Sequence, residues 1–534
     1  MSAVTLHNDR LSTPAIAEPP LRRIAHIPGT DGWPIIGLTL PLLLDSKGEM
    51  ERLAARFGPV FRGRAFGFRT ISLLGPEANE FVLFDQAKTF SSKHGWNKLL
   101  ERLFPRGLML LDFDEHRLHR KALSVAFKSG PMKSYLESLN RGIECGIAGW
   151  KSGKREMLLY PAVKQLTLDL AAVSFLGAEL GPEVEPLKNA FIDMVAASVA
   201  LVRKPIPGTR MARGVKGRAL MIDYFSRQID ARRASEGADL FTHLCKATTD
   251  DGNLLTRQQI VDHMIFFMLA AHDTLASSLT SFVWFLSANP EWQETLRAEV
   301  QSLGLAKGEP LPYERLDDLP LTGMAFKESL RLMPPVPQIP RRAMRNTEFG
   351  GYRIPAGSTV AVSPLFTHRM PDVWPEPEKF DPLRFTEEAS RGRHKFAFVP
   401  FGGGAHMCIG LNFAYMQAKC FAYHLLSTTK VSVAPGYKPD WQFWPIPKPR
   451  DGLRVRLNQT APCAPPLPQQ AGERDYPALD FFNPSLLQAK LDGPASKDSG
   501  SLRDGPDRPQ RLRYYHSNGF RDFNELRSCP GENR

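Results

Sequence analysis

The stretch from Met264 to Ala288, MIFFMLAAHDTLASSLTSFVWFLSA, is the feature that most restricts the fold of this chain. It is long and apolar enough to imitate a membrane span, but His272 and Asp273 lie near its middle. A charge at that depth in a bilayer would cost ~2.5–3.5 kcal/mol on insertion scales. The sequence therefore favours a buried central helix of a soluble protein over a membrane protein. The polar pair becomes a candidate feature of an active site.

Other segments predict a mainly α fold with a minor β-sheet region. Helical periods dominate from residue 77 to residue 289, and prolines mark the breaks between helices. Further helices are expected at 50–57, 290–301, 321–332 and after Cys408. Strands are expected at 60–64 and 69–74, and a hairpin over 349–363 that turns at Pro355-Ala356-Gly357.

The two ends of the chain differ from its body. Residues 1–30 contain no apolar run, so we expect a disordered lead-in without a signal peptide or anchor. Residues 460–534 carry ten prolines and no clear apolar period, which is typical of a disordered tail. Residues 31–459 are expected to form one catalytic domain.

Charge and cysteine content narrow the partners and the compartment. The net charge is +12, and ten basic residues after residue 459 are balanced by ten acidic ones, so the excess lies in the body. A basic body suits an acidic protein or an anionic membrane surface, and no nucleic-acid motif accompanies it. The six cysteines show neither zinc-ligand spacing nor a disulfide framework. A reducing cytoplasm is the expected compartment.

The segment FAFVPFGGGAHMCIG, residues 396–410, carries the strongest chemical signal. Three successive glycines permit a tight turn with the backbone close to a flat ligand. Cys408 then precedes a helical pattern, whose amino-terminal N–H groups would favour a thiolate. Gly410 would leave room beside the sulfur, and His406 could donate to an anionic group on the same ligand. A buried cysteine after a glycine turn, with no chemistry, is the alternative for Cys408 taken alone.

This segment resembles the haem-binding signature of the cytochrome P450 family, Phe-x-x-Gly-x-Arg-x-Cys-x-Gly. Phe401, Gly404, Cys408 and Gly410 match the signature, and His406 stands where arginine is usual. The resemblance implies haem b with the Cys408 thiolate as the axial ligand of its iron. It also implies the family fold, with the haem between the central long helix and the helix that follows the cysteine loop.

A second match implies a structural scaffold behind the haem. Glu328-Ser329-Leu330-Arg331 fits the family's Glu-x-x-Arg, whose two charges share one helix face. Pro382-Leu383-Arg384-Phe385 fits the family's Pro-x-Arg-Phe. The resemblance implies that Glu328, Arg331 and Arg384 form one buried charge network.

A third match lies in the central helix. Ala270-Ala271-His272-Asp273-Thr274 resembles the family's oxygen-activation motif, and Ala270 and Thr274 share one helix face. The resemblance assigns Thr274 the hydroxyl beside bound dioxygen and Asp273 the proton relay. A buried helix acid with local hydrogen bonds is the alternative for Asp273.

Basic residues elsewhere match the family's partners for the haem propionates. His116 and Arg120 lie four residues apart in DEHRLHRK, which resembles the family's His-x-x-x-Arg segment. Arg341 matches the position of another propionate arginine. Solvated basic helix faces are the alternative for all three residues.

The resemblance, which covers residues 28–455, implies a monooxygenase that uses O2 to hydroxylate a lipophilic substrate. Pro28-Gly29 and Lys204-Pro205-Ile206-Pro207-Gly208-Thr209 resemble the branch of sterol, triterpenoid and retinoid hydroxylases. No reductase module is visible, so electrons should come from a separate ferredoxin or flavoprotein reductase, and an acidic donor suits the basic body. Peripheral membrane contact is compatible with this reading.

Two other functions would use the same haem site. One is a haem-thiolate enzyme that rearranges or dehydrates peroxides without a reductase, against which the retained Asp273-Thr274 pair argues. The other is a haem-binding sensor or carrier, in which substrate would not accelerate consumption of the electron donor. A phosphate-binding loop at Gly402–Gly404 is excluded, because no Gly-Lys-Ser/Thr follows.

Overall fold

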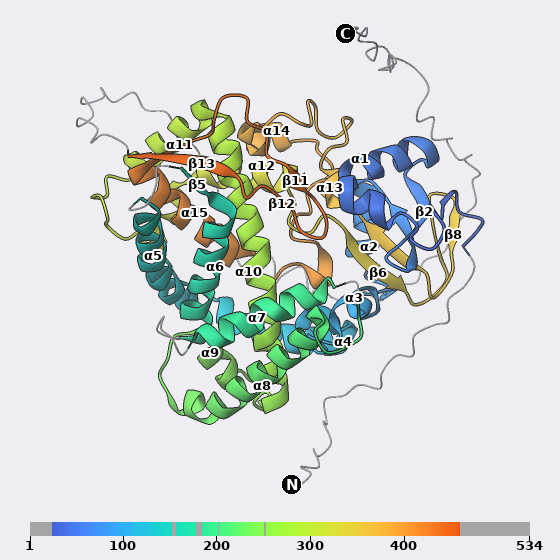
Figure 1. Cartoon of the computed structure of the whole chain (residues 1–534), viewed down its shortest axis with the longest axis horizontal. Helices are drawn as coiled ribbons and strands as arrows, with labels where there is room; N and C mark the ends of the chain where they lie inside the picture. Colours follow the sequence, from blue (N-terminus) through green and yellow to red (C-terminus); the bar gives the residue numbers. More distant parts are fainter. Residues whose placement is uncertain (1–23, 152–155, 178–183, 201, 250–251, 460–534) are drawn as a thin grey trace, which may run out of the picture. The chain divides into compact units, whose positions relative to one another are not determined.

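The computed structural model describes residues 24–151, 156–177, 184–200, 202–249 and 252–459. Helices make up most of this part and gather around the long helix α10 (Figure 1). The helices are α1 Thr39–Phe57, α2 Pro76–Leu83, α3 Lys93–Leu100, α4 Phe113–Ser124, α5 Ser129–Lys151, α6 Leu159–Leu176, α7 Glu185–Ser198, α8 Arg210–Ala234, α9 Leu240–Lys246, α10 Arg257–Ala288, α11 Pro290–Ser302, α12 Pro320–Leu332, α13 Pro364–Thr367, α14 Glu387–Ser390 and α15 Leu411–Thr428.

The strands form small sheets at the edges of the helical body. They are β1 Gly29–Thr30, β2 Val60–Ala65, β3 Phe68–Leu73, β4 Phe90–Ser91, β5 Glu156–Leu158, β6 Ile339–Ala343, β7 Thr347–Phe349, β8 Tyr352–Ile354, β9 Thr359–Val362, β10 Thr429–Ser432, β11 Trp441–Gln442, β12 Lys448–Pro449 and β13 Arg454–Gln459. The largest sheet has the order β1-β2-β3-β9-β6-β4, a second has the order β10-β13-β5, and β7-β8 and β11-β12 are two-stranded.

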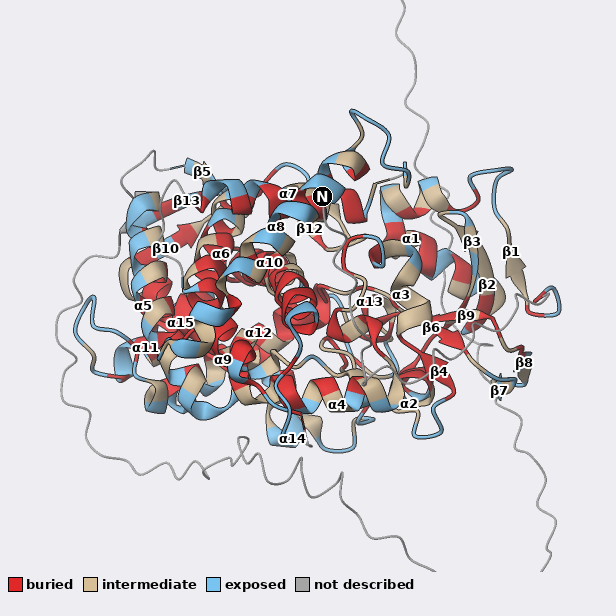
Figure 2. Ribbon diagram, turned by 90° about the horizontal axis from the view of Figure 1, so that it is seen from below, coloured by how far each residue is buried: buried red, intermediate tan, exposed pale blue. Residues whose placement is uncertain are grey.

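The central helix α10 is buried along most of its length (Figure 2). Its apolar side chains join one large core with α5, α6, α8, α12 and α15. A capping box at Thr256 and Gln259 fixes its first turn, where each side chain accepts from the other residue's backbone N–H. No helix in the described ranges is long and apolar enough to cross a membrane. The fold is thus mainly helical with small sheets, as expected.

Several predicted elements are confirmed with small changes in their ends. The two predicted strands are β2 and β3, which pair antiparallel with Val60 opposite Leu73. The helices predicted at 290–301 and 321–332 are α11 and α12, and the short helix at 50–57 is the end of the longer α1. The helix expected after Cys408 begins three residues later, at Leu411.

The hairpin predicted over 349–363 is wrong. The chain reverses instead at Gly350 and Gly351, whose φ angles of 58° and 80° suit the two-residue turn between β7 and β8. The turn at 355–357 sends the chain into β9, which pairs antiparallel with β6 and parallel with β3. A sequence pattern shows both turns but not which strands pair across them.

The disorder predicted for residues 1–30 is wrong for residues 24–30, and residues 1–23 lie outside the described part. Ile24 and Ile27 are buried against the sheet, at 7% and 1% exposure. Gly29–Thr30 forms β1 and pairs parallel with β2. Gly29 has a φ of 145°, and a Cβ there would lie 2.1 Å from the carbonyl oxygen of Arg62, so only glycine allows this approach. The predicted tail 460–534 also lies outside the described residues.

Candidate active site

The cysteine loop owes its shape to glycines that allow close backbone contact. Gly404 has a φ of 61°, and a Cβ there would lie 2.1 Å from the carbonyl oxygen of Leu83. A Cβ at Gly403 would lie 2.4 Å from the ring of Phe84. The backbone N–H of Cys408 donates to the carbonyl of Phe401 at 2.9 Å, which closes the loop. The cysteine loop therefore packs closely against the end of α2, and this packing fixes the backbone position of Cys408.

Cys408 lies on an accessible surface inside the protein. Its side chain is exposed, yet burial among protein atoms raises the pKa of its thiol. The two observations agree if the accessible surface is that of an internal space. The N–H of Gly410 and the charge of Arg120 act in the opposite direction and favour the thiolate. A Cβ at Gly410 would lie 4.0 Å from the Cys408 sulfur, which is ordinary contact, so the protein atoms alone do not require glycine there.

Four basic side chains gather near the cysteine loop. The rings of His116 and His406 lie 3.9 Å apart between centroids. Burial, together with the charges of Arg120 and Arg341, lowers the pKa of His116 to about 3. The pKa of His406 falls for the same reasons, well below its usual range. Burial also lowers the pKa of Arg341 to about 10. Because these groups come from α4, β6 and the cysteine loop, the fold brings the four predicted propionate partners together.

Asp112 is an acid that lies close to this basic cluster. Its Oδ1 lies 3.8 Å from Nε2 of His406. The same oxygen accepts from the backbone N–H groups of Ser92 and Lys93 at 2.8 and 3.2 Å. Asp112 thus accepts hydrogen bonds at the start of α3, and its negative charge is partly balanced by these N–H groups.

These residues fit a bound haem. A haem needs an axial sulfur, backbone or flat side chains near its ring, and cationic partners for two propionates. Cys408 supplies the sulfur, Arg120 and Arg341 supply the cations, and the neutral rings of His116 and His406 can supply N–H donors. Phe127 lies 5.7 Å from Phe267 of α10, between ring centroids, and 3.9 Å from where a Cβ of Gly410 would be. One aromatic ring therefore lies between the cysteine loop and α10.

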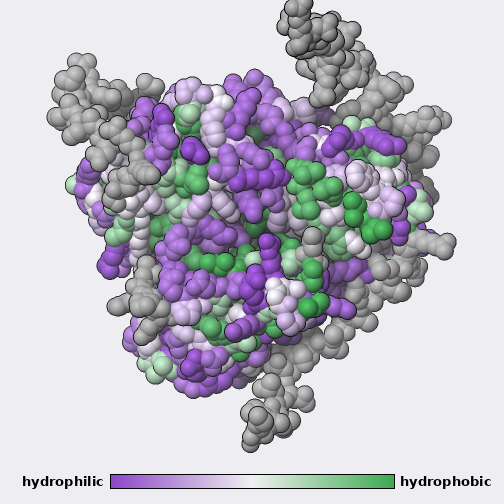
Figure 3. Space-filling view, viewed as in Figure 1, coloured by the Kyte–Doolittle hydropathy of each residue, from purple (hydrophilic) through white to green (hydrophobic). Residues whose placement is uncertain are grey.

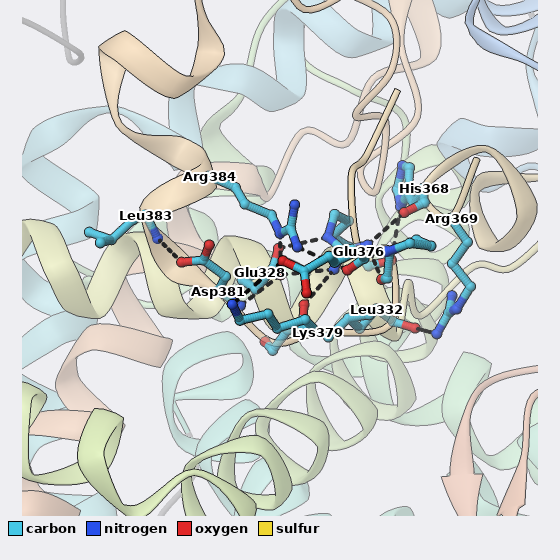
Figure 4. A network of polar contacts seen from close by, with 12 residues as sticks. Glu328, Leu332, His368, Arg369, Glu376, Lys379, Asp381, Leu383 and Arg384 are labelled. Atoms are coloured by element: carbon cyan, nitrogen blue, oxygen red, sulfur yellow. Dashed lines mark hydrogen bonds and ion pairs between the residues drawn. The ribbon is translucent and has the colours of Figure 1, made fainter. Parts of the chain in front are cut away.

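Glu328, labelled in the polar network of Figure 4, forms the buried centre of this network together with Arg331. Both side chains have zero exposure, and Arg331 donates to the two carboxylate oxygens at 2.7 and 2.8 Å. Nε of Arg384 lies 3.3 Å from Oε1 of Glu328. Arg331 also donates to the carbonyls of His368, Pro377 and Lys379. The network therefore ties α12 to the irregular segment that leads into the cysteine loop.

His368 is a member of this network that the sequence did not reveal. Its Nδ1 lies 3.3 Å from the carbonyl oxygen of Arg331, and the backbone N–H of Val399 donates to its Nε2 at 3.0 Å. An acceptor Nε2 requires a neutral ring, and burial beside Arg331 and Arg369 lowers the pKa of His368 to about 3. His368 thus connects the scaffold to the strand of chain that enters the cysteine loop.

The predicted oxygen-activation residues lie on the accessible part of α10. Ala270 is exposed and Thr274 is half-buried, whereas residues 259–268 of the same helix are buried. The Thr274 hydroxyl donates to the carbonyl oxygen of Ala270 at 2.6 Å. Ala270 and Thr274 therefore share one face, as predicted, and the hydroxyl is oriented by its own helix.

Asp273 has partners that the sequence did not reveal. Its Oδ1 lies 3.1 Å from Nζ of Lys164 in α6 and 3.2 Å from Nδ1 of His272. Burial raises the pKa of Asp273, but the hydrogen bond from His272 and the charge of Lys164 outweigh it, and the pKa is about 2. Lys164 is 33% exposed, so it connects the buried carboxylate to the surface. No local motif marks Lys164, because the pair is formed by the packing of α6 on α10.

The comparisons with known proteins identify the family of the chain. The chain matches the cytochrome P450 family profile over residues 27–446. It is 36% identical over 459 residues to the putative cytochrome P450 136 of Mycobacterium tuberculosis, covering 85% of this chain and 92% of that protein. It is 30% identical over 449 residues to the taxane 10-beta-hydroxylase of Taxus cuspidata, covering 80% and 89%.

Among solved structures, the retinoic acid bound cyanobacterial CYP120A1 superposes with a TM-score of 0.73 at 31% identity. The match covers 81% of this chain and 99% of that one. The family holds haem through a cysteine thiolate, and the residues described above fit that cofactor. The chain belongs to the cytochrome P450 family.

Proposed function

We propose that this cytochrome P450 monooxygenase hydroxylates a polycyclic or isoprenoid substrate, with Cys408 as the axial ligand of its haem. The observation that carries the assignment of the ligand is the convergence of the accessible Cys408 sulfur with four basic side chains. When bound, the haem supplies the activation of O2 and the transfer of one oxygen atom to the substrate. His116, Arg120, Arg341 and His406 would hold the propionates.

We assign proton delivery to Asp273 and its neighbours. The carboxylate is ionised at neutral pH, since its pKa is about 2, and it is held by Lys164 and His272. The ammonium of Lys164 lies between the ionised carboxylate and the solvent, so the pair would orient water molecules that deliver protons to this part of α10. The Thr274 hydroxyl, on the next residue, would then hold a proton at the accessible face of α10. This pair of relay groups disfavours an enzyme that works on peroxides alone.

A mostly apolar cavity supports a lipophilic substrate. It has a volume of about 150 Å³ and lies between α1, β2, β3, α3 and the turn before β12. Its lining includes Leu42, Phe61, Phe66, Trp96, Val336 and Trp444. Ligand sites for whole drug-sized molecules are larger, ~300–1,000 Å³, so this cavity would hold only one part of a substrate.

Exposed apolar side chains lie on α1 and in the turn before it, close in sequence to residues that line the cavity. Leu38 and Leu42 line the cavity, and Leu40 and Leu44 of the same helix are exposed. Trp33, Ile35 and Ile36 are exposed in the preceding turn. Figure 3 shows green, apolar side chains over the α1 region of a face that is otherwise largely hydrophilic. A lipophilic molecule would thus meet an apolar surface before it enters.

The relatives supply the proposed substrate class. One relative is a taxane hydroxylase and one similar structure binds retinoic acid, and both ligands are built from isoprene units. Electrons would come from a separate acidic donor protein, either a ferredoxin or a flavoprotein reductase, since the net charge of this chain is +12. All four cysteines within the described ranges are free thiols, which suits a reducing compartment such as the cytoplasm.

A spectral titration tests the proposed substrate class. Steroids, retinoids, taxanes and other terpenoids would be added to the oxidised haem protein, with fatty acids of similar length as the control class. Displacement of a haem-bound water shifts the Soret band, so the isoprenoid panel is expected to give saturable shifts and accelerated consumption of the electron donor. Shifts with fatty acids alone would overturn the isoprenoid proposal. Shifts without any donor consumption would favour a haem-binding sensor.

A further inference from the structure

Two buried histidines join the helix α4 to the central helix α10. Nδ1 of His119 and Nε2 of His263 lie 2.7 Å apart, and the two rings meet at an interplanar angle of 62°. His119 and His263 are 2% and 1% exposed. A contact this short between two ring nitrogens is a hydrogen bond, in which one nitrogen donates its N–H and the other accepts. The bond therefore requires exactly one proton between the two nitrogens.

The buried face of α4 is only partly apolar. It consists of His116, His119, Ala122 and Leu123, so imidazole rings occupy half of it. Apolar side chains would fill the same space without the cost of burying ring nitrogens. A hydrogen bond between two buried rings is directional, however, and forms only at a narrow range of distances and orientations. The pair therefore fixes the placement of α4 on α10 more narrowly than apolar contact would.

The placement of α4 matters for the basic cluster beside the cysteine loop. His116 and Arg120 of α4 belong to that cluster, and the ring centroid of His116 lies 3.9 Å from that of His406. His119 follows His116 by three residues on the same helix face, and its electrostatic effect contributes to the low pKa of His116. A shift of α4 relative to α10 would thus move His116 and Arg120 away from the cysteine loop.

Charged and titratable groups from four segments surround the histidine pair. They are Arg106 between α3 and α4, Glu115, His116 and Arg120 of α4, Arg218 of α8 and Asp262 of α10. Arg106 pairs with Glu115, and Arg218 pairs with Asp262 at 3.0 Å. The two carboxylates are therefore already matched by two arginines, and a charged imidazole here would add a cation without a partner.

A proton added to His263 would be held in an unfavourable place. Nδ1 of His263 has no hydrogen-bond partner among the residues that the structure describes. Burial lowers the pKa of His263 well below its usual range, and the charges of His119, Arg106 and His116 act in the same direction. Because His263 is 1% exposed, hydration of the charged ring requires α4 to move away from α10.

We propose that the hydrogen bond between His119 and His263 is an acid-sensitive link that keeps α4 in the position in which it holds the haem. Both histidines are positioning residues, since they act through His116 and Arg120 of α4. The inference rests on the proposed function in one respect, that His116 and Arg120 bind the haem propionates.

The direction of the pH dependence follows from the two forms of the contact. In the open form His263 is hydrated and has the ordinary pKa of about 6.5, whereas the closed form keeps the ring neutral. The closed form is therefore favoured fully above pH 6.5 and progressively less as the pH falls below it, because only the open form binds the proton. At pH 5 protonation favours the open form about thirtyfold.

Transfer of haem from the haem-loaded, full-length protein to excess apomyoglobin tests the link without knowledge of the substrate. The transfer rate is read from the Soret band between about pH 7.5 and about pH 5. The informative variant is the double substitution His119→Asn with His263→Gln. The glutamine amide nitrogen then takes the place of Nε2 and the asparagine amide oxygen the place of Nδ1, so the hydrogen bond is kept without a titrating group.

Wild type and the double variant should lose haem at similar rates at pH 7.5. Towards pH 5 we expect the wild-type rate to rise about thirtyfold more than the rate of the double variant. His263→Leu removes the bond and leaves His119 without this partner, so it should lose haem about fivefold faster than wild type at pH 7.5.

A matched control separates this link from general unfolding in acid. His424 of α15 is also buried, its Nε2 lies 2.8 Å from Oδ1 of Asn140, and burial lowers its pKa to about 4. His424→Gln removes a buried titrating ring that is not part of the contact between α4 and α10. Haem loss from this variant should keep the full acid acceleration of wild type.

The outcomes distinguish the link from the proposed function. Equal acid acceleration in wild type and the double variant would overturn the link, and so would equal suppression by His424→Gln. If the double variant does not fold, His263→Gln carries the test, since its amide nitrogen still donates to His119. If the wild-type protein binds no haem, the proposed haem site itself fails. If it binds haem but all variants respond to acid as wild type does, only the link fails.

Discussion

Arginines hold together both the region behind the cysteine loop and the region around the substrate cavity, but they do so differently. Arg331 is fully buried and bound to the Glu328 carboxylate by two hydrogen bonds. Arg203, between α7 and α8, is half-buried and bound to the backbone carbonyls of Ser198 and Leu99, the second of which lines the cavity. Loss of a buried charge partner is far more costly than loss of a carbonyl bond. The difference indicates that the cofactor side is held by interactions that are more costly to break than those beside the cavity.

The largest effect is expected from Arg331→Ala. This change leaves Glu328 buried without its main partner and removes the bonds to three carbonyls of the segment before the cysteine loop. Breaking such a buried pair costs ~3–5 kcal/mol of the free energy of unfolding. Urea unfolding and haem content would measure the loss. Full haem content and wild-type stability in this variant would contradict the claim that the Glu328–Arg331 pair stabilises the region behind the cysteine loop.

The next effect concerns the relay on α10. Asp273→Asn keeps the shape of the side chain but removes the charge that binds Lys164. We expect kcat to fall about 10²-fold, the lower end for a positioned proton-transfer group, with substrate binding unchanged. The solvent isotope effect on kcat should increase.

Lys164→Met serves as the companion variant, because it leaves the carboxylate in place and removes its link to solvent. It should show a smaller fall in kcat with the same isotope signature. A normal kcat in Asp273→Asn would mean that Asp273 is a structural acid of the helix and takes no part in proton delivery.

A smaller effect should come from the neutral ring of His368. Its pKa is about 3 in the folded protein and 6.5 in the unfolded chain, so only the unfolded chain binds a proton between these values. The stabilisation is therefore complete above pH 6.5 and is lost as pH falls toward 3, by about 1.4 kcal/mol per pH unit.

His368→Gln tests this dependence, since the amide oxygen can accept the N–H of Val399 without titrating. Unfolding free energies measured in urea from pH 6.5 down to about pH 5 should fall less steeply in the variant than in wild type. An identical slope in both proteins would mean that His368 is not held neutral by this bond.

The smallest effect is expected for an exposed arginine that takes part in neither region. Arg227 pairs with Asp223 one turn earlier on α8, and the two side chains are 72% and 61% exposed. Arg227→Ala should change the free energy of unfolding by less than about 0.5 kcal/mol. Urea unfolding at two salt concentrations would check this value. A larger loss would show that the removal of any arginine, and not the burial of its partner, determines the loss of free energy of unfolding.

The sequence predicts the contacts behind the cysteine loop better than those around α6, α10 and the cavity. Glu328, Arg331 and Arg384 stand in short patterns, because the charges that must meet come from fixed positions of a helix and a following turn. Lys164, His368 and Arg203 stand in no pattern. Each meets its partner through the packing of distant elements, and Arg203 binds only backbone, which every residue carries.

The errors in the fold have the same origin. The hairpin was predicted at Pro355-Ala356-Gly357, although the tighter turn at Gly350-Gly351 closes it. The strand β9 then joins β3, which lies almost three hundred residues earlier in the chain. Residues 24–30 were predicted to be disordered because their own apolar content is low, yet β2 and the sheet around it bury Ile24 and Ile27. Local patterns carry turns and periods, but not the long-range pairings that decide burial.

The central claim is that Cys408 ligates the haem iron as a thiolate. The most direct test is the absorption spectrum of the reduced protein with carbon monoxide, recorded for wild type and for Cys408→Ala. The account predicts a strongly red-shifted Soret band in wild type, because the thiolate donates electron density to the iron, and the loss of this band in the variant. An unshifted band in wild type, or a shifted band that survives in Cys408→Ala, would contradict it.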